Sequence, residues 1–186
     1  MKLNFIPDGQ LSESTRSTVW IVLITVSSVL FSLGFACATP FAALAAIAGS
    51  KMTRANGIAL VTACWLANQA VGYLVLDYPR TPGSFGWGFA IGTAAIVATF
   101  AAHELNRLAW HPIINTAAAF AVAFVVYQAA LYSATAVLPS GGGFALAVIL
   151  YVGKINLLGF AALLAVYHLS VAAGLMTTPT KRLSSG

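Results

Sequence analysis

The sequence predicts an all-α integral membrane protein with six transmembrane helices, the second of them short. Composition is the first reason: 60% of the residues are hydrophobic and only 7% are charged, whereas soluble domains carry about 25% charged residues. The second reason is that hydrophobic runs follow one another, with short polar breaks between them. Most runs approach the roughly 20 residues that a helix needs to cross a bilayer. We therefore expect a multi-pass protein of the inner (cytoplasmic) membrane.

The chain is expected to form one membrane domain with a short tail at each end. Residues 1–17 form a polar, cytoplasmic N-terminal segment, residues 18–176 the six-helix domain, and residues 177–186 a cytoplasmic tail. The first apolar run is of spanning length, longer than the apolar stretch of a signal peptide, so no cleavable signal is expected. No linker or convincing internal repeat divides the chain.

Six apolar runs define the expected helices in chain order. Pro40 precedes the second run and the Gly49–Ser50 pair ends it, which favours a half-length or tilted helix. The alternative is a five-span chain in which the first two runs fuse through Pro40. The runs cover residues 19–38, 41–49, 58–76, 88–102, 113–137 and 144–175.

The positive charges favour six spans, with both termini in the cytoplasm. Arg80 alone lies on the outer side of the six-span arrangement, and Lys154 lies inside a span. A five-span chain would move Lys51 and Arg54 outside and blur this bias toward the cytoplasm. The basic residues are scattered singly at segment ends, which argues against nucleic-acid binding. Those on the inner side are Lys2, Arg16, Lys51, Arg54, Arg107, Lys181 and Arg182.

The third run carries a polar and aromatic stripe. Trp65, Asn68, Gln69 and Tyr73 follow helical spacing and share one face. Two side-chain amides on such a stripe either form hydrogen bonds between helices or line a binding cavity, and the sequence leaves both interpretations open. The stripe runs toward the expected outer loop, where a ligand could enter.

The expected outer loop, "LDYPRTPGSFGWG", is rich in proline, glycine and aromatic residues. Tyr78, Phe85 and Trp87 either belong to an interfacial aromatic belt or form a lid over a pocket. Asp77 and Arg80 are the charged residues of this loop.

Lys154 interrupts the last apolar run, in "AVILYVGKINLLGF". A lysine at the bilayer centre costs roughly 2.5–3.5 kcal/mol on insertion scales, so an ionisable residue there indicates a functional site. The alternative is that its four-carbon stem carries the amine to the membrane surface. Asn156 lies two residues later, so one of the two side chains, and not both, is expected to point into a cavity.

No pattern predicts an enzyme, a metal site or a bound cofactor. His103, Glu104, Arg107 and His111 cluster in the polar break before the fifth run, but their spacing does not supply converging metal ligands. The two cysteines lie in apolar runs and lack the spacing of a metal site. An enzyme acting on a lipid or quinone would need His103, Glu104 or His168 for turnover.

The order of features resembles the membrane-embedded S components of energy-coupling factor vitamin transporters, with the biotin-specific members closest. The features are the Ala-rich short helix "PFAALAAIAG", the basic turn "SKMTRANG", the outer loop and helix start "GSFGWGFAIG" ending in "AAHE", and the early lysine in "YVGKINLLG". The resemblance covers roughly residues 19–172 and is one of layout.

The resemblance implies a vitamin-like ligand held near the outer surface, in a pocket that maps to Asn68, Gln69, Tyr73, Trp87 and Lys154. It also implies that a small-residue stripe, here Ala42 and Ala46, contacts a transmembrane coupling subunit that works with ATPases.

Together, the residues and the resemblance lead us to expect binding and uptake of a small polar or anionic metabolite. Lys154 would neutralise the charge of the ligand, and Trp65 and Asn156 complete the candidate site. The chain contains no nucleotide-binding motif of its own, so energy would come from partners. The alternative is a structural or assembly subunit of a membrane complex, in which Lys154 pairs with an acidic residue of a partner helix.

Overall fold

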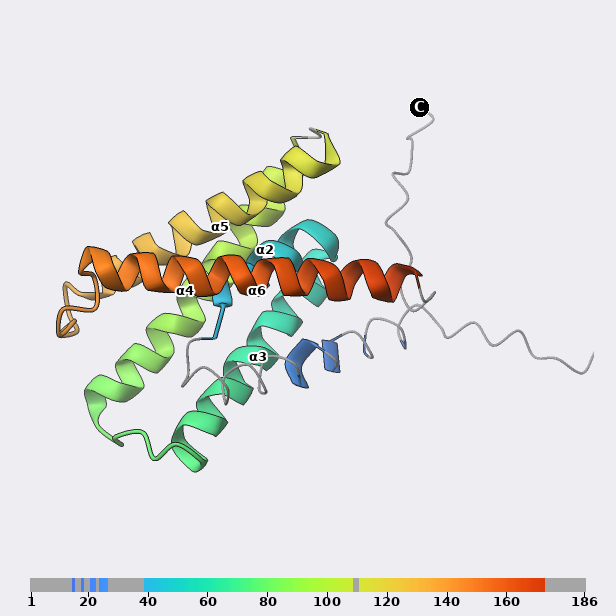
Figure 1. Ribbon diagram of the computed structural model, residues 1–186. Helices are drawn as coiled ribbons and strands as arrows, with labels where there is room; N and C mark the ends of the chain where they lie inside the picture. Colours follow the sequence, from blue (N-terminus) through green and yellow to red (C-terminus); the bar gives the residue numbers. More distant parts are fainter. Residues whose placement is uncertain are drawn as a thin grey trace, which may run out of the picture.

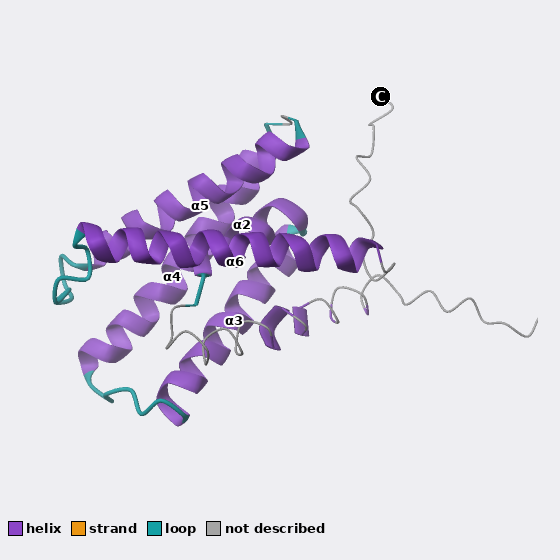
Figure 2. Ribbon diagram, in the orientation of Figure 1, coloured by secondary structure: helices purple, strands orange, loops and turns teal. Residues whose placement is uncertain are grey.

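The computed structural model describes residues 39–108 and 111–172, together with residues 15, 18, 21, 22 and 24–26. The described part contains helices and their connections and no strand (Figure 2). Most of the expected first span, nearly all of the N-terminal segment, the C-terminal tail and residues 173–176 lie outside the described residues. The six-span count and the cytoplasmic placement of the termini therefore stay predictions.

Five helices follow one another after residue 39, and four of them are long and apolar enough to cross a membrane. This agrees with the expected multi-pass membrane protein. The long helices are α3 (Arg54–Leu74), α4 (Pro82–Asn106), α5 (Pro112–Ala134) and α6 (Leu146–Ala172); the short one is α2 (Phe41–Lys51).

Helix α2 is the expected short helix, and it forms the core of the molecule. Its 11 residues rise about 16 Å, half of the roughly 30 Å hydrocarbon thickness. Every residue from Phe41 to Ser50 is buried. Helices α3, α4, α5 and α6 all pack against it, and Figure 1 shows it at the centre of the bundle. Its alanines are what make this possible, because small side chains let neighbouring backbones come close.

Two glycines mark the closest approaches to α2. A Cβ atom on Gly49 would lie 2.7 Å from the carbonyl oxygen of Thr99, so the end of α2 packs directly on the backbone of α4. A Cβ atom on Gly159 would lie 2.6 Å from the ring of Pro40, so α6 crosses the chain where α2 begins.

The expected outer loop is shorter than its sequence indicated, because α4 begins earlier. The Thr81 side chain accepts a hydrogen bond from the Ser84 amide at 3.3 Å, and Pro82 occupies the first turn. A threonine cap followed by proline is a strong helix start. Phe85 and Trp87 are therefore helical, and the prediction that they lie in a loop is wrong. At its other end α4 continues to Asn106, past the expected boundary at residue 102.

Helix α6 packs mainly on α2 and makes few contacts with α5. Because α4 and α5 pack closely together while α6 stands apart from α5, space remains between α5 and α6 on the side where α2 begins. Residues 135–145, which connect α5 to α6, close one side of this space.

Candidate functional site

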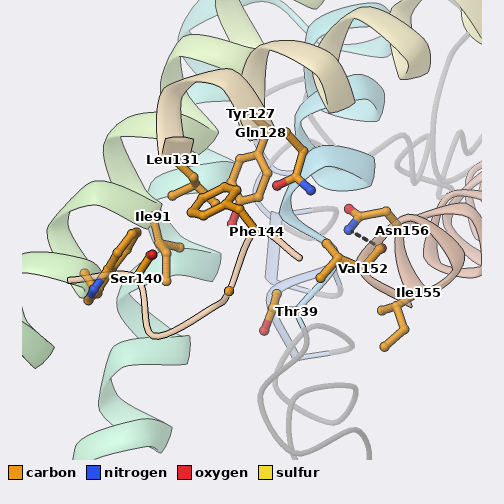
Figure 3. A pocket seen from close by; sticks show the side chains of 12 residues that line it. Thr39, Ile91, Tyr127, Gln128, Leu131, Ser140, Phe144, Val152, Ile155 and Asn156 are labelled. Atoms are coloured by element: carbon orange, nitrogen blue, oxygen red, sulfur yellow. Dashed lines mark hydrogen bonds between the residues drawn. The ribbon is translucent and has the colours of Figure 1, made fainter. Parts of the chain in front are cut away.

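A cavity of about 400 Å³ lies between α4, α5, α6 and the start of α2. This is within the size range of small-molecule sites. Figure 3 shows the side chains that line it. They are Thr39, Trp87, Ile91, Tyr127, Gln128, Leu131, Ser140, Gly143, Phe144, Val152, Ile155 and Asn156.

Asn156 lines the cavity and caps the first turn of α2. Its Oδ1 accepts hydrogen bonds from the amides of Ala42 at 3.1 Å and Ala43 at 3.2 Å. Its Nδ2 donates to the carbonyl of Val152 at 2.9 Å. The first amides of a helix have no partner within the helix, and inside a membrane no water replaces one. Asn156, only 2% exposed, is therefore the group that lets α2 begin in the middle of the bundle.

Helix α3 positions Thr39 through a hydrogen bond. Its hydroxyl donates to Oδ1 of Asn68 at 2.6 Å, and both residues are buried. Asn68 does not line the cavity itself. Asn68 instead fixes the side chain of Thr39, which lines the cavity.

Aromatic residues form much of the wall. Trp87 donates its indole N–H to the carbonyl of Pro139 at 3.0 Å, which ties α4 to the α5–α6 connection. The Tyr127 ring lies 6.5 Å from that of Phe41, and the Phe144 ring packs edge-on against Tyr132 at 5.4 Å. These contacts hold flat apolar surfaces in place around the cavity.

Gln128 is a lining side chain with free hydrogen-bonding capacity. Its amide makes no hydrogen bond to a side chain or backbone group of the described residues, and in Figure 3 it turns toward the same space as Asn156. A primary amide offers one acceptor and two donors. It is therefore the group best placed to recognise a polar ligand.

Among the described residues, the twelve that line the cavity carry no charge. Lys154 in particular is exposed on the outer face of α6, near the exposed side chains of Leu150, Tyr151, Leu157 and Leu158. Of the two residues of which one was expected to point inward, Asn156 lines the cavity. Lys154 is not among the residues that line the cavity, so the structure does not place it as the counter-charge of a ligand bound there.

Most of the stripe predicted on the third run packs against α4 rather than around the cavity. Trp65 donates to the carbonyl of Gly88 at 2.8 Å, and Tyr73 bonds the Ser84 hydroxyl at 3.0 Å and stacks on Phe85. Gln69 also faces Gly88. These three side chains hold α3 against α4, whereas Trp87 and Asn156 of the predicted set line the cavity.

Ala42 and Ala46 are not on the surface. Both are 0% exposed inside the bundle. The expectation that they contact a coupling subunit is corrected, because a side chain with no exposed area offers a partner nothing to touch. Their small size serves packing within the chain.

The last turn of α4 forms ion pairs. Glu104 binds Arg54 and Arg107, each at 2.8 Å, and all three side chains are partly exposed. Among the described residues no group of three His, Cys, Asp or Glu side chains could hold a metal ion.

Sequence reasoning missed Tyr127, Gln128 and Phe144. Gln128 carried a usable signal, since it is the amide in the second half of an apolar run, next to a tyrosine. Phe144 carried none, because a phenylalanine at the edge of an apolar run is ordinary.

Comparisons of the chain with protein-family models, with curated proteins and with solved structures found no match.

Proposed function

We propose that this chain is a membrane-embedded binding protein that takes part in the uptake of a small, uncharged, partly polar molecule. The cavity carries the proposal, because it combines a ligand-sized volume, aromatic walls and the uncommitted amide of Gln128. Small-molecule sites have this character, with mainly apolar walls and a few polar groups that set orientation.

An uncharged ligand fits this cavity better than the anionic metabolite expected from the sequence. A carboxylate or phosphate in a low-dielectric site needs a positive partner. The described residues of the lining offer none, and the first amides of α2 are already bound by Asn156. A ring system with hydrogen-bonding groups at its edge would match Trp87, Phe144 and Gln128.

The transport role and its resemblance to a vitamin-binding S component are part of this proposal. They rest on the short buried helix, the ligand-sized cavity and the absence of a nucleotide-binding motif from the sequence. A coupling subunit would then contact the outer faces of the bundle, since the Ala42 and Ala46 stripe is internal.

The test is mass spectrometry of small molecules released from gently purified protein. Wild type is compared with Gln128→Leu, which removes the recognising amide, and with Lys154→Ala as a matched control on the same bundle. We expect a small molecule that is enriched in wild type and in Lys154→Ala and at least about tenfold depleted in Gln128→Leu. A tenfold loss of affinity corresponds to about 1.4 kcal/mol of binding free energy. A species retained by Gln128→Leu and lost from Lys154→Ala would overturn the proposal.

The exposed position of Lys154 favours one second candidate, a structural subunit of a membrane complex. A lysine among exposed leucines on α6 could pair with a carboxylate on a partner helix. The same purification tests it: a co-purifying membrane protein lost from Lys154→Ala, with no bound small molecule in either form, would support this function.

A further inference from the structure

A second polar cluster lies at the opposite end of α2 from the cavity, where α2, α4 and α5 meet. Asn106 donates from Nδ2 to the carbonyl of Ser50 at 3.1 Å, and Asn115 donates from Nδ2 to Oδ1 of Asn106. Beside them Lys51 donates to the hydroxyl of Thr116 at 2.7 Å. The cluster therefore links the last turn of α2 to both neighbouring helices.

Three buried polar atoms of this cluster have no hydrogen-bond partner among the described residues: Ser50 Oγ, His103 Nδ1 and Asn115 Oδ1. Ser50 and Asn115 are only 9% and 8% exposed. Most buried polar atoms in native proteins are paired with protein or ordered water. Three orphans in one region indicate that something else satisfies them.

The residues that carry the three atoms are neighbours at this end of α2. Asn106 bonds both Ser50 and Asn115, and His103 lies three residues before Asn106, on the same face of α4. The backbone amide of His103 lies 2.8 Å from where a Cβ atom of Gly49 would stand, so the residue before Ser50 packs on the backbone of α4 at His103. A single small molecule could reach all three.

The chemistry of the site selects an uncharged occupant. Because Asn106 donates from Nδ2 to the carbonyl of Ser50, its Oδ1 is the atom that accepts from Nδ2 of Asn115. Oδ1 of Asn115 is then left as an unpaired acceptor. The occupant must therefore donate a hydrogen bond to it. The Lys51 ammonium disfavours a cation, and the carbonyl end of the α2 dipole disfavours an anion. Water donates and accepts, and it normally makes about three hydrogen bonds when buried.

We propose that the inner ends of α2, α4 and α5 enclose an internal water site held by Ser50 Oγ, His103 Nδ1 and Asn115 Oδ1. Helix α2 then separates two polar compartments, the ligand cavity at its first residue and a hydrated site at its last turn. The buried, Ala-rich segment from Ala42 to Gly49 lies between the two compartments.

The direction in which Ser50→Ala changes the melting temperature tests this proposal. If water satisfies the hydroxyl, the variant loses a hydrogen bond and the melting temperature falls by a few degrees. If the hydroxyl is dry and unpaired, removing it raises the melting temperature or leaves it unchanged, which overturns the proposal. Ser133→Ala is the matched control, because that exposed hydroxyl bonds the carbonyl of its own helix at Ala129.

A double-mutant cycle tests whether the atoms share one water. Asn115→Ala is measured in wild type and in Ser50→Ala. If one water serves both residues, Asn115→Ala lowers the free energy of unfolding less in the Ser50→Ala background than in wild type. Strict additivity, or an experimental structure that shows protein side chains filling the point between the three atoms, would overturn the proposal.

Discussion

At the scale of single residues, Asn156 does most to position the cavity, because one carboxamide caps a buried helix and lines the site. In Asn156→Ala the amides of Ala42 and Ala43 lose their acceptor inside the bundle. We expect the free energy of unfolding to fall by about 2 kcal/mol. Thermal denaturation in detergent measures this, with exposed Leu157→Ala on the same helix as the control. Equal losses in both variants would contradict the capping role.

Residue-scale reasoning from the sequence placed Lys154 and Asn156 on different faces and ranked Lys154 first, whereas Asn156 is the one that lines the cavity. Their spacing of two places them on different faces. A lone lysine in an apolar run signals function, but its long stem also allows it to sit at the surface. Only the packing of α6 on α2, which the sequence does not contain, decides which face is inside.

At the scale of elements, α6 crosses the chain closely at Pro40, beside the cavity-lining residue Thr39. In Gly159→Ala the new methyl group would stand 2.6 Å from the proline ring, whereas in Gly153→Ala it would stand 3.5 Å from Phe124, an ordinary contact. Overpacking of this kind costs about 1–3 kcal/mol. We expect Gly159→Ala to lower the melting temperature clearly more than Gly153→Ala. The reverse order would contradict the crossing.

The elements themselves were largely predictable. The helices α2 to α6 correspond to the apolar runs, and Pro40 predicted the short one. The start of α4 was missed because Thr81 and Pro82 were interpreted as loop residues rather than as a cap and first turn. The cavity was predictable only in part, since helices that are apolar on all sides give no periodic signal for their neighbours. Trp87 and Asn156 stood out as polar-tipped residues, whereas Ile91 and Val152 did not.

At the scale of the whole molecule, the order of long helices predicts which connections share a side of the membrane. With α4 and α5 each spanning once, Pro79 and Ala136 lie on one side and Leu108 on the other. Single cysteines at these exposed positions, in a chain whose own cysteines are replaced, are treated with a membrane-impermeant maleimide on intact cells. The six-span prediction adds that positions 79 and 136 react from outside and position 108 only after permeabilisation. Labelling of all three from one side would contradict the span assignment.

The central claim for the whole molecule is that the cavity between α4, α5 and α6 holds a small uncharged ligand. An experimental structure of the protein, purified gently in lipid nanodiscs, tests this most directly. We predict non-protein density between Phe144 and Asn156, within hydrogen-bonding distance of the Gln128 amide. A cavity filled by side chains of this chain or by a lipid tail, with no contact to Gln128, would contradict the account.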